Sequence, residues 1–257
     1  MLTIIQQEVL TGLMLGDGSL EKRAKNAALR IVRSLRDKDY ILYHMNIFSN
    51  IKHSQSDLEY FDIRTNKTYY KSTLYVSCNK DFTDAHSLWY VNRKKSIPKD
   101  LKLTPTTLAT WFADDGCVTI RPGKYEIKLA TQGFSKEEVL FLQEKLNKQF
   151  TLNFKMYQDN SGKTPHWTLR LINKFDVKQF IDVIDKYFPE AMSRKSDIWR
   201  NNMHLFAEKH YPSCKFCGFE KVHKYGLDNK KTAVKFKCTK CNRTFQIKLS
   251  LYENQIR

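Results

Sequence analysis

Two short acidic segments, far apart in the chain, carry residue types that could do hydrolytic chemistry. They span residues 10–18 and 108–116, and each ends in an Asp-Gly pair whose acids are Asp17 and Asp115. Two carboxylates that meet in a fold can hold Mg²⁺ together with waters and phosphate oxygens. Such an ion activates a water and stabilises the leaving oxygen of a phosphodiester. One such segment alone would indicate an ordinary helix end, so the interpretation depends on the pair.

The offset of 98 positions that relates Asp17 to Asp115 also relates the residues that follow them. Leu29, Arg30 and Ile31 fall on Ile127, Lys128 and Leu129, and Asp37 falls on Ser135. The alternation of apolar and basic residues is typical of a half-buried strand. Asp or Ser at the start of the next helical stretch is typical of an N-cap, and Ser135 with Glu138 forms a capping box. We therefore predict two copies of one structural unit.

Each copy is predicted to contain a helix, two strands, a second helix, two further strands and a closing helix. The second helices are expected to end near residues 51 and 150. The later strands are expected at 57–64 and 68–77 in the first copy, and at 151–158 and 166–172 in the second. The closing helices are expected at 81–91 and 176–187. The predicted fold class is α+β, with pseudo-symmetric halves at 1–100 and 101–205.

The first helices of the two halves are expected to pack against each other. Small residues recur four positions apart on one face of each, which lets two backbones approach closely; they are Gly12 and Gly16 in the first helix, and Ala109 and Ala113 in the second. Pro105 suits the first turn of the second helix. Gly18 and Gly116 are expected in left-handed turns that end the helices. This packing would bring two acids together at negative helix ends, where their repulsion favours a bound cation.

The two acidic segments resemble the paired motifs of LAGLIDADG homing endonucleases, in the branch that carries both half-units in one chain. The resemblance covers about residues 1–200 and is most specific in the segments 94–98, 103–105, 111–116 and 131–135. It implies a saddle of two β-sheets over double-stranded DNA, with the motif helices at its centre. It also implies a long asymmetric target site and cleavage across the minor groove that leaves short 3′ overhangs.

By this resemblance, Asp17 and Asp115 would bind Mg²⁺, one acid for each scissile phosphate. The backbone carbonyls of Gly16 and Asp114 would be minor ligands. The first motif departs from the family's name sequence, because Leu15 and Gly16 replace its earlier Asp and Ala. Since the later acid is present in both motifs, we expect an active enzyme.

The resemblance also implies polar residues beside the acids. Lys95 matches a basic residue that could steady the phosphate or polarise the water, and its counterpart in the second half is either Arg194 or Lys195. Gln132 matches a polar residue at the edge of the water network.

The charge balance indicates a polyanionic partner. Lysine and arginine number 44 against 27 aspartate and glutamate, a net charge of +17. A solvated lysine-rich surface is the alternative. Candidates for contact with DNA lie on the polar face of the predicted strands: Arg30, Lys128, Lys155, Arg170, Tyr69 and Lys71. A β-ribbon fits the major groove, where Arg and Lys pair with guanine. For each of these residues, an ordinary surface position without contact to DNA is the alternative.

Composition changes near residue 206, and the segment 206–257 carries 12 Lys and Arg against 4 Asp and Glu. It contains two Cys-x₂-Cys pairs, Cys214 with Cys217 and Cys238 with Cys241. Two such pairs bring four thiolates to one tetrahedral Zn²⁺, whereas a redox site, the alternative, needs one pair only. The segment resembles the zinc ribbons of some transposases, which implies a small β-hairpin module that binds DNA. We predict that it folds around the metal and adds affinity without taking part in chemistry.

Sequence features also bear on location. No apolar run approaches the roughly 20 residues that span a bilayer, and the first eight residues lack a basic start. We expect a protein that is not secreted, makes no membrane contact and works in a reducing intracellular compartment of a bacterium, a phage-infected cell or an organelle. With both motifs in one chain, it is expected to act as a monomer.

Two alternative functions remain at this stage. The chain could be a maturase that binds host intron RNA, since some family members assist splicing. It could also be a non-catalytic DNA-binding regulator. Both alternatives predict that Asp17→Asn and Asp115→Asn leave function intact, whereas an endonuclease would lose cleavage and keep DNA binding.

Overall fold

The computed structural model describes residues 1–23, 25–160, 165–206, 212–220 and 222–249. Residue contacts divide the chain into two units, Met1–Phe206 and Ala207–Arg257. Each unit has its own cluster of buried apolar side chains. Among the described residues, none of the helices combines the length and the apolar character needed to cross a bilayer.

The first half of the first unit follows the predicted order of elements. It comprises α1 (Ile4–Leu15), β1 (Ser19–Arg23), β2 (Asn26–Ser34), α2 (Lys38–Ile47), β3 (His53–Asp62), β4 (Lys67–Asn79) and α3 (Lys80–Trp89), with a 3₁₀ turn η1 (Leu35–Asp37) before α2. The strands form an antiparallel sheet in the order β1-β2-β4-β3. Leu29 and Ile31 face the core opposite Val76 and Leu74, so the apolar alternation sets which face is buried.

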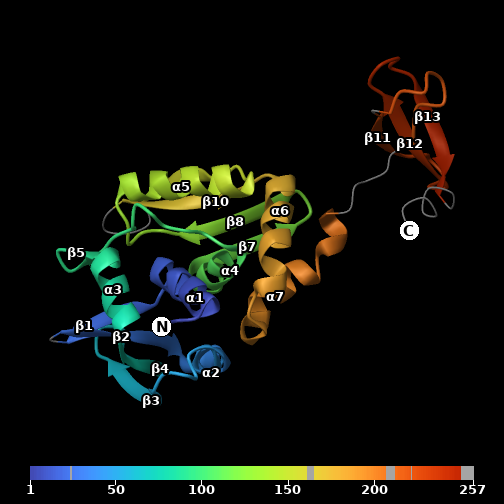
Figure 1. Ribbon diagram of the computed structural model, residues 1–257. Helices are drawn as coiled ribbons and strands as arrows, with labels where there is room; N and C mark the ends of the chain where they lie inside the picture. Colours follow the sequence, from blue (N-terminus) through green and yellow to red (C-terminus); the bar gives the residue numbers. More distant parts are fainter. Residues whose placement is uncertain (24, 161–164, 207–211, 221, 250–257) are drawn as a thin grey trace. The chain divides into compact units, whose positions relative to one another are not determined.

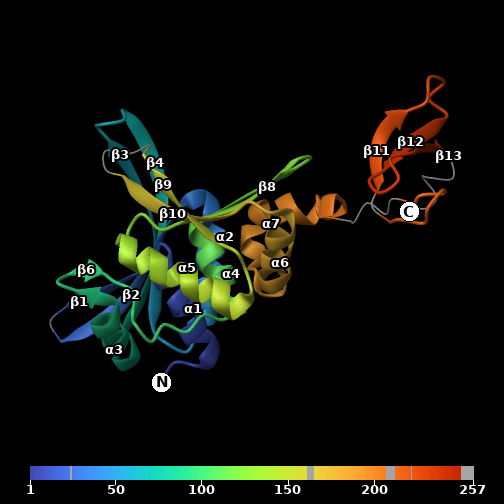
Figure 2. The same ribbon diagram turned by 90° about the horizontal axis from the view of Figure 1, so that it is seen from above.

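The second half repeats this order. It comprises α4 (Pro105–Asp115), β7 (Gly116–Arg121), β8 (Lys124–Ala130), α5 (Lys136–Phe150), β9 (Lys155–Asp159), β10 (His166–Leu171) and α6 (Lys174–Ile184). Its sheet has the equivalent order β7-β8-β10-β9. A short hairpin of β5 (Tyr90–Val91) and β6 (Lys94–Lys95) precedes it, and α7 (Ser193–Arg200) follows it, with 3₁₀ turns η2 (Asp185–Tyr187), η3 (Glu190–Met192) and η4 (Met203–Phe206). Figures 1 and 2 show α1 beside α4 between the two sheets.

The predicted α+β fold of two helix-and-sheet halves is confirmed. The division into 1–100 and 101–205 stays a prediction. The strand expected from residue 151 begins only at Lys155, because Thr151, the C-cap of α5, takes a left-handed conformation with φ of 54°. The strand expected from residue 57 begins earlier, at His53.

Local capping signals were mostly right. Ser135 and Glu138 form the predicted capping box, and Pro105 lies in the first turn of α4 behind the N-cap Thr104. Asp37 stands at the predicted N-cap position of α2, but its side chain makes no capping hydrogen bond. It accepts two hydrogen bonds from the Arg194 guanidinium instead, at 3.0 Å each. The guanidinium engages both carboxylate oxygens at once, which adds geometric specificity as well as energy.

The second unit contains a three-stranded antiparallel sheet rather than the predicted hairpin alone. Its strands are β11 (Val222–Leu227), β12 (Ala233–Cys238) and β13 (Thr244–Lys248), with β12 in the middle. Val234, Phe236 and Phe245 form its small core. So few buried residues give the unit little stability on their own, so a bound metal would supply part of its folding free energy.

Candidate active site

Helices α1 and α4 approach closely at the two glycines of α1. A Cβ atom on Gly12 would lie 2.6 Å from the Cβ of Thr110 and 2.7 Å from the carbonyl oxygen of Thr107. A Cβ on Gly16 would lie 2.5 Å from the Cβ of Asp114. These distances are too short for any side chain, so glycine sets the spacing between the helices. The contact brings the C-terminal ends of both helices side by side.

The α4 residues nearest to the two glycines are not the predicted alanines. We expected Ala109 and Ala113 there, but the atoms nearest to the α1 glycines belong to α4 residues that include Thr110 and Asp114. These are the residues that the 98-position offset relates to Gly12 and Gly16. Equivalent positions meet because the two helices cross near the local symmetry axis.

The predicted left-handed turns at Gly18 and Gly116 were also wrong. Neither glycine is among the described residues with positive φ, and Gly116 has a φ of −81°. Close packing, rather than backbone conformation, requires glycine at both positions. A Cβ on Gly116 would lie 2.1 Å from a ring carbon of Phe112, and one on Gly18 would lie 2.7 Å from the Cβ of Leu13. Each strand therefore starts directly against the last turn of its helix.

Asp17 and Asp115 meet at these helix ends. Both line one cavity of about 140 Å³, together with Gly16, Lys95 and Gln132. The Asp17 side chain is 47% exposed, whereas Asp115 is partly buried. The structure thus brings the acids of the two motifs together, as the interpretation of the sequence requires.

The cavity is electrostatically unfavourable for carboxylates alone. Burial, and then the nearby Asp17 and Asp114, raise the pKa of Asp115 to about 7. Complete burial also raises the pKa of Asp114 to about 6, although the Arg33 guanidinium opposes this shift. A cation among these groups would relieve the repulsion.

Two lysines contact the helix ends in equivalent ways. The Lys95 Nζ donates to the carbonyl oxygens of Gly16 and Gly18, at 2.9 and 2.8 Å. The Lys195 Nζ donates to four carbonyl oxygens within 112–116, at 2.7 to 3.2 Å. Burial lowers the pKa of Lys95, and lowers that of Lys195 to about 8. Of the two candidates left open, Lys195 therefore stands in the place equivalent to Lys95, while Arg194 pairs with Asp37.

A third basic residue beside the acids, Arg33, was not predicted. Its side chain is 8% exposed, and its guanidinium forms ion pairs with both Asp17 and Asp114. The signal was present in the sequence, because Arg33 shares the buried face of β2 with Leu29 and Ile31. A cation at a core position needs a buried partner.

The donors present suit a hard divalent cation. Asp17 and Asp115 offer carboxylates, and Gly16 and Asp114 offer carbonyl oxygens close by, so every donor is oxygen. The raised pKa of Asp115 reflects burial first and then the charges of Asp17 and Asp114, which a cation would balance. The residues therefore fit the predicted magnesium site.

The predicted DNA-contacting side chains share the solvent face of the two sheets. In the second sheet Lys128, Arg170 and Lys155 are aligned across β8, β10 and β9. In the first sheet Arg30 lies opposite Tyr75, on the face away from Leu29 and Ile31. A cavity of about 510 Å³ runs from Asp17 onto this face and is lined by residues that include Ser34, Tyr60, Tyr69 and Lys71.

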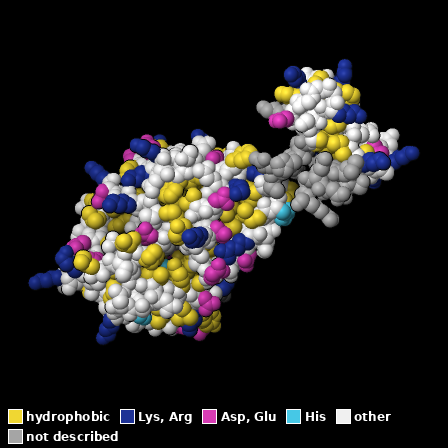
Figure 3. All heavy atoms as spheres, turned by 45° about the vertical axis from the view of Figure 1, so that its right-hand side comes forward, with side chains coloured by type: hydrophobic (Ala, Val, Ile, Leu, Met, Phe, Trp, Pro, Cys, Tyr) yellow, Lys and Arg dark blue, Asp and Glu magenta, His cyan; other side chains and the backbone are white. Residues whose placement is uncertain are grey.

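Several of these cations already have protein partners. Arg30 pairs with Glu21 at 2.8 Å, and Lys128 pairs with Asp159 at 3.1 Å. Both pairs keep partial access to solvent, so a phosphate that reaches this face can compete with the carboxylate for the cation. In the view of Figure 3, basic side chains lie dispersed among acidic ones on the first unit rather than in one patch.

Comparison with known proteins agrees with this geometry. Residues 7–180 match the model of the LAGLIDADG DNA endonuclease family. The chain belongs to this family. A probable intron-encoded endonuclease of Wickerhamomyces canadensis is 31% identical over 209 residues, which are 76% of this chain and 84% of that protein.

The chain is also similar to a maturase and to a solved endonuclease structure. A cytochrome b mRNA maturase (bI2) of Debaryomyces hansenii is 29% identical over 158 residues, 59% of either chain. The solved structure of the homing endonuclease I-WcaI, bound to its DNA recognition sequence, is 27% identical and superimposes with a TM-score of 0.68 over 76% of this chain and 86% of that one. The chain spans about half the length of several curated relatives that it matches.

The matched family region ends at residue 180 and does not include the four cysteines of the second unit. The ligand atoms of Cys214, Cys217, Cys238 and Cys241 all lie within 4.8 Å of one another. The sulfurs of Cys214 and Cys241, and those of Cys217 and Cys238, are 3.7 Å apart. A tetrahedron with metal–sulfur bonds of about 2.3 Å has edges of about 3.8 Å. The backbone N–H groups of Lys240 and Cys241 donate to the Cys238 sulfur, which favours a thiolate. The cluster therefore fits zinc.

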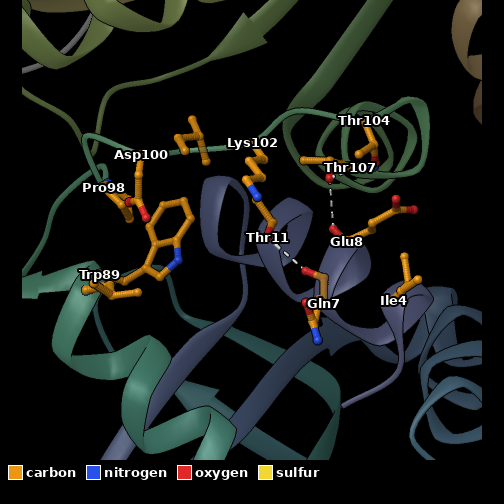
Figure 4. A pocket seen from close by; sticks show the side chains of 12 residues that line it. Ile4, Gln7, Glu8, Thr11, Trp89, Pro98, Asp100, Lys102, Thr104 and Thr107 are labelled. Carbon is orange, nitrogen blue, oxygen red and sulfur yellow. Dashed lines mark hydrogen bonds between the residues drawn. The ribbon is translucent and has the colours of Figure 1, made fainter. Parts of the chain in front are cut away.

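A larger pocket lies away from the acids, at the N-terminal ends of α1 and α4. It encloses about 370 Å³, and its walls include Gln7, Glu8, Trp89 and Lys102 (Figure 4). The Thr107 hydroxyl donates to the Glu8 carbonyl oxygen at 3.1 Å and joins the two helices there. Because neither motif acid lines this pocket, it lies outside the candidate active site.

Proposed function

We propose that this protein is a site-specific endonuclease that cuts both strands of double-stranded DNA in a Mg²⁺-dependent reaction and leaves short 3′ overhangs. One observation carries the proposal: the acids of two separate motifs, Asp17 and Asp115, line a single cavity at the ends of two packed helices. The family membership and the likeness to a DNA-bound homing endonuclease support it.

In this proposal each half serves one scissile phosphate. Asp17 and Asp115, with the carbonyls of Gly16 and Asp114, would hold divalent cations, which activate a water and neutralise the leaving oxygen. Lys95 and Lys195 lie at the helix ends, where an ammonium can orient a phosphate. Gln132, which is exposed beside the cavity, would bind ordered water.

The two sheets would bind a long asymmetric site. The row of Lys128, Arg170 and Lys155 faces solvent in register, while the equivalent row of the first sheet holds Arg30 and Tyr75. Tyr69 and Lys71 extend the first sheet's face beyond Asp17. Because the two rows differ, the halves would read different sequences. The protein would act as a monomer in a reducing intracellular compartment.

The test begins with selection of cleaved sites from a random DNA library in the presence of Mg²⁺. On the selected site, Asp17→Asn with Asp115→Asn should abolish cleavage and leave DNA affinity within about threefold, since most affinity comes from phosphate contacts elsewhere. Gel assays of cutting and binding measure both.

The matched control replaces one exposed aspartate in each half, Asp84→Asn with Asp182→Asn. In the part of the chain that the structure describes, each of these pairs with a lysine four residues earlier and lies away from the candidate active site, so cleavage should be unchanged. Undiminished cutting by the Asp17 and Asp115 variant would contradict the proposal.

For the second unit we propose a structural zinc site in a ribbon that adds DNA affinity. Cys217→Ser with Cys238→Ser should release the metal and unfold the unit, because its core is small. DNA affinity should fall about tenfold or more through loss of tethering, while cleavage continues at high protein concentration. Zinc content and binding isotherms measure the two effects.

Cys78→Ser is the control for the zinc variants, since Cys78 is a lone exposed cysteine outside the cluster. Loss of all cleavage while the first unit remains folded would contradict a purely accessory role.

A second candidate function is host intron RNA maturation, which the similarity to cytochrome b mRNA maturases favours. The Asp17 and Asp115 variant separates the two functions, because splicing assistance should survive it and DNA cleavage should not.

A further inference from the structure

Arg33 joins the two halves at the acids. One of its terminal nitrogens contacts Asp17 Oδ2, and the other contacts Asp114 Oδ1. The Asp114 side chain is completely buried and also accepts hydrogen bonds from the Tyr40 hydroxyl, at 3.1 Å, and from the Asp17 backbone N–H, at 3.0 Å. The Asp17 carboxylate is thereby tied to α4 on one side and keeps its other oxygen available.

The second half has no such arrangement at Asp115. The 98-position offset relates Arg33 to Thr131, and it relates Asp114 to Gly16. The Thr131 hydroxyl donates to the Trp167 carbonyl oxygen at 2.7 Å and carries no charge. Within the described residues, the Asp115 carboxylate makes neither a hydrogen bond nor a salt bridge. One acid is therefore held by an internal cation, and the other is not.

The two lysines do not account for this difference. Lys95 and Lys195 contact equivalent carbonyl oxygens in the two halves, and among the described residues neither ammonium forms an ion pair with Asp17 or Asp115. A guanidinium in contact with a carboxylate repels any divalent cation that binds the same group. It also occupies one of the two oxygens that could serve as ligands.

We propose that Arg33 is a positioning residue that makes the Asp17 side of the site bind divalent cations more weakly than the Asp115 side. The strand attacked at Asp115 is then cut first, and the strand attacked at Asp17 second. The order of cutting rests on the proposed endonuclease function; the difference in cation binding does not. A purely structural role for Arg33, compensating the buried Asp114, predicts no difference between the sides.

The first experiment measures Mn²⁺ binding to the full-length, zinc-loaded protein without DNA, by electron paramagnetic resonance. Mn²⁺ takes the same oxygen ligands as Mg²⁺. Asp115→Asn leaves only the Asp17 side, and Asp17→Asn leaves only the Asp115 side. Arg33→Thr, which introduces the residue of the second half, is then added to each.

Arg33→Thr should raise Mn²⁺ affinity about tenfold on the Asp17 side and less than about threefold on the Asp115 side, because the guanidinium contacts Asp17 and, of the two motif acids, not Asp115. An equal rise on both sides, or none on either, would overturn the proposal.

Two further variants control for unfolding and for the loss of a positive charge as such. Arg33→Thr leaves Asp114 buried without its cation, so Arg33→Thr with Asp114→Asn removes both charges and should show the same selective rise. Arg36→Thr removes an exposed arginine from the next turn of the chain and should leave both affinities unchanged. A selective rise in the double variant supports the proposal even if Arg33→Thr alone unfolds.

The second experiment follows each strand of the selected DNA site with its own end label. In the wild-type protein, nicked DNA should accumulate with the cut on the Asp115 strand, and Arg33→Thr should bring the two rates within about threefold of each other. Equal rates in the wild type would overturn the predicted order. Absence of all cutting would contradict the proposed function, and the Mn²⁺ measurement would still decide the role of Arg33.

Discussion

In the first half, β2 places Arg33 on its buried face beside Asp17, and α2 adds Tyr40 and His44 beneath it. The equivalent positions in the second half hold Thr131, Glu138 and Leu142, of which the glutamate serves a capping box. The strand order is equivalent in both halves, and Lys95 and Lys195 share a pair of equivalent carbonyl contacts. The comparison teaches that packing of the repeat has been kept while the chemistry around each acid has diverged.

The buried ion pairs give the largest expected difference between the halves. Arg33→Thr should lower the free energy of unfolding of the first unit by about 3 to 5 kcal/mol, because it leaves the buried Asp114 carboxyl group without its cation. The equivalent change Thr131→Val removes one hydrogen bond and should cost about 1 kcal/mol. Urea denaturation followed by tryptophan fluorescence compares the two variants. Equal losses in their free energies of unfolding would contradict the proposed difference between the halves.

The two halves also differ in how tightly the glycine of each Asp-Gly pair is packed. Gly116→Ala should destabilise the first unit by about 3 kcal/mol, because a Cβ would lie 2.1 Å from the Phe112 ring. Gly18→Ala, with its nearest contact at 2.7 Å, should cost about 1 to 2 kcal/mol. Gly133→Ala is the control, since nothing lies within 4 Å of its Cβ position. Thermal unfolding measures both variants. If Gly18→Ala proved less stable than Gly116→Ala, the structure around Gly116 would relax more easily than that around Gly18.

The buried histidine makes the first half sensitive to acid. His44 is fully buried with both ring nitrogens unpaired among the described residues, and burial lowers its pKa to about 3. A lowered histidine pKa gives stability that is fully present above about pH 6.5 and is lost as pH falls toward 3. His44→Leu, which copies Leu142, should therefore lose about 2 kcal/mol less stability than the wild type between pH 7.5 and pH 5.

Urea unfolding of both proteins at the two pH values measures this effect. Parallel losses in the two proteins would show that another group accounts for the acid sensitivity of the fold.

Much of the scaffold could be predicted from the sequence, because its signals act over a few residues. Alternation at Leu29 and Ile31 set the buried face of β2, the Ser135 capping box set the start of α5, and the Cys-x₂-Cys spacing brought four sulfurs together. The 98-position repeat then paired Asp17 with Asp115, and the helix ends do meet. Each of these depends on local periodicity or on the symmetry of the repeat.

The surroundings of the acids were decided only by the tertiary structure. Arg33 reaches Asp114 across 81 positions of sequence, and Lys195 reaches the end of α4 across about 80. The sequence alone could not choose between Arg194 and Lys195, since neighbours on a helix point in different directions and only packing decides which one faces the acids. The physical reason is that a local pattern fixes which face of an element is buried, whereas the partner of a buried charge depends on which other element lies against that face.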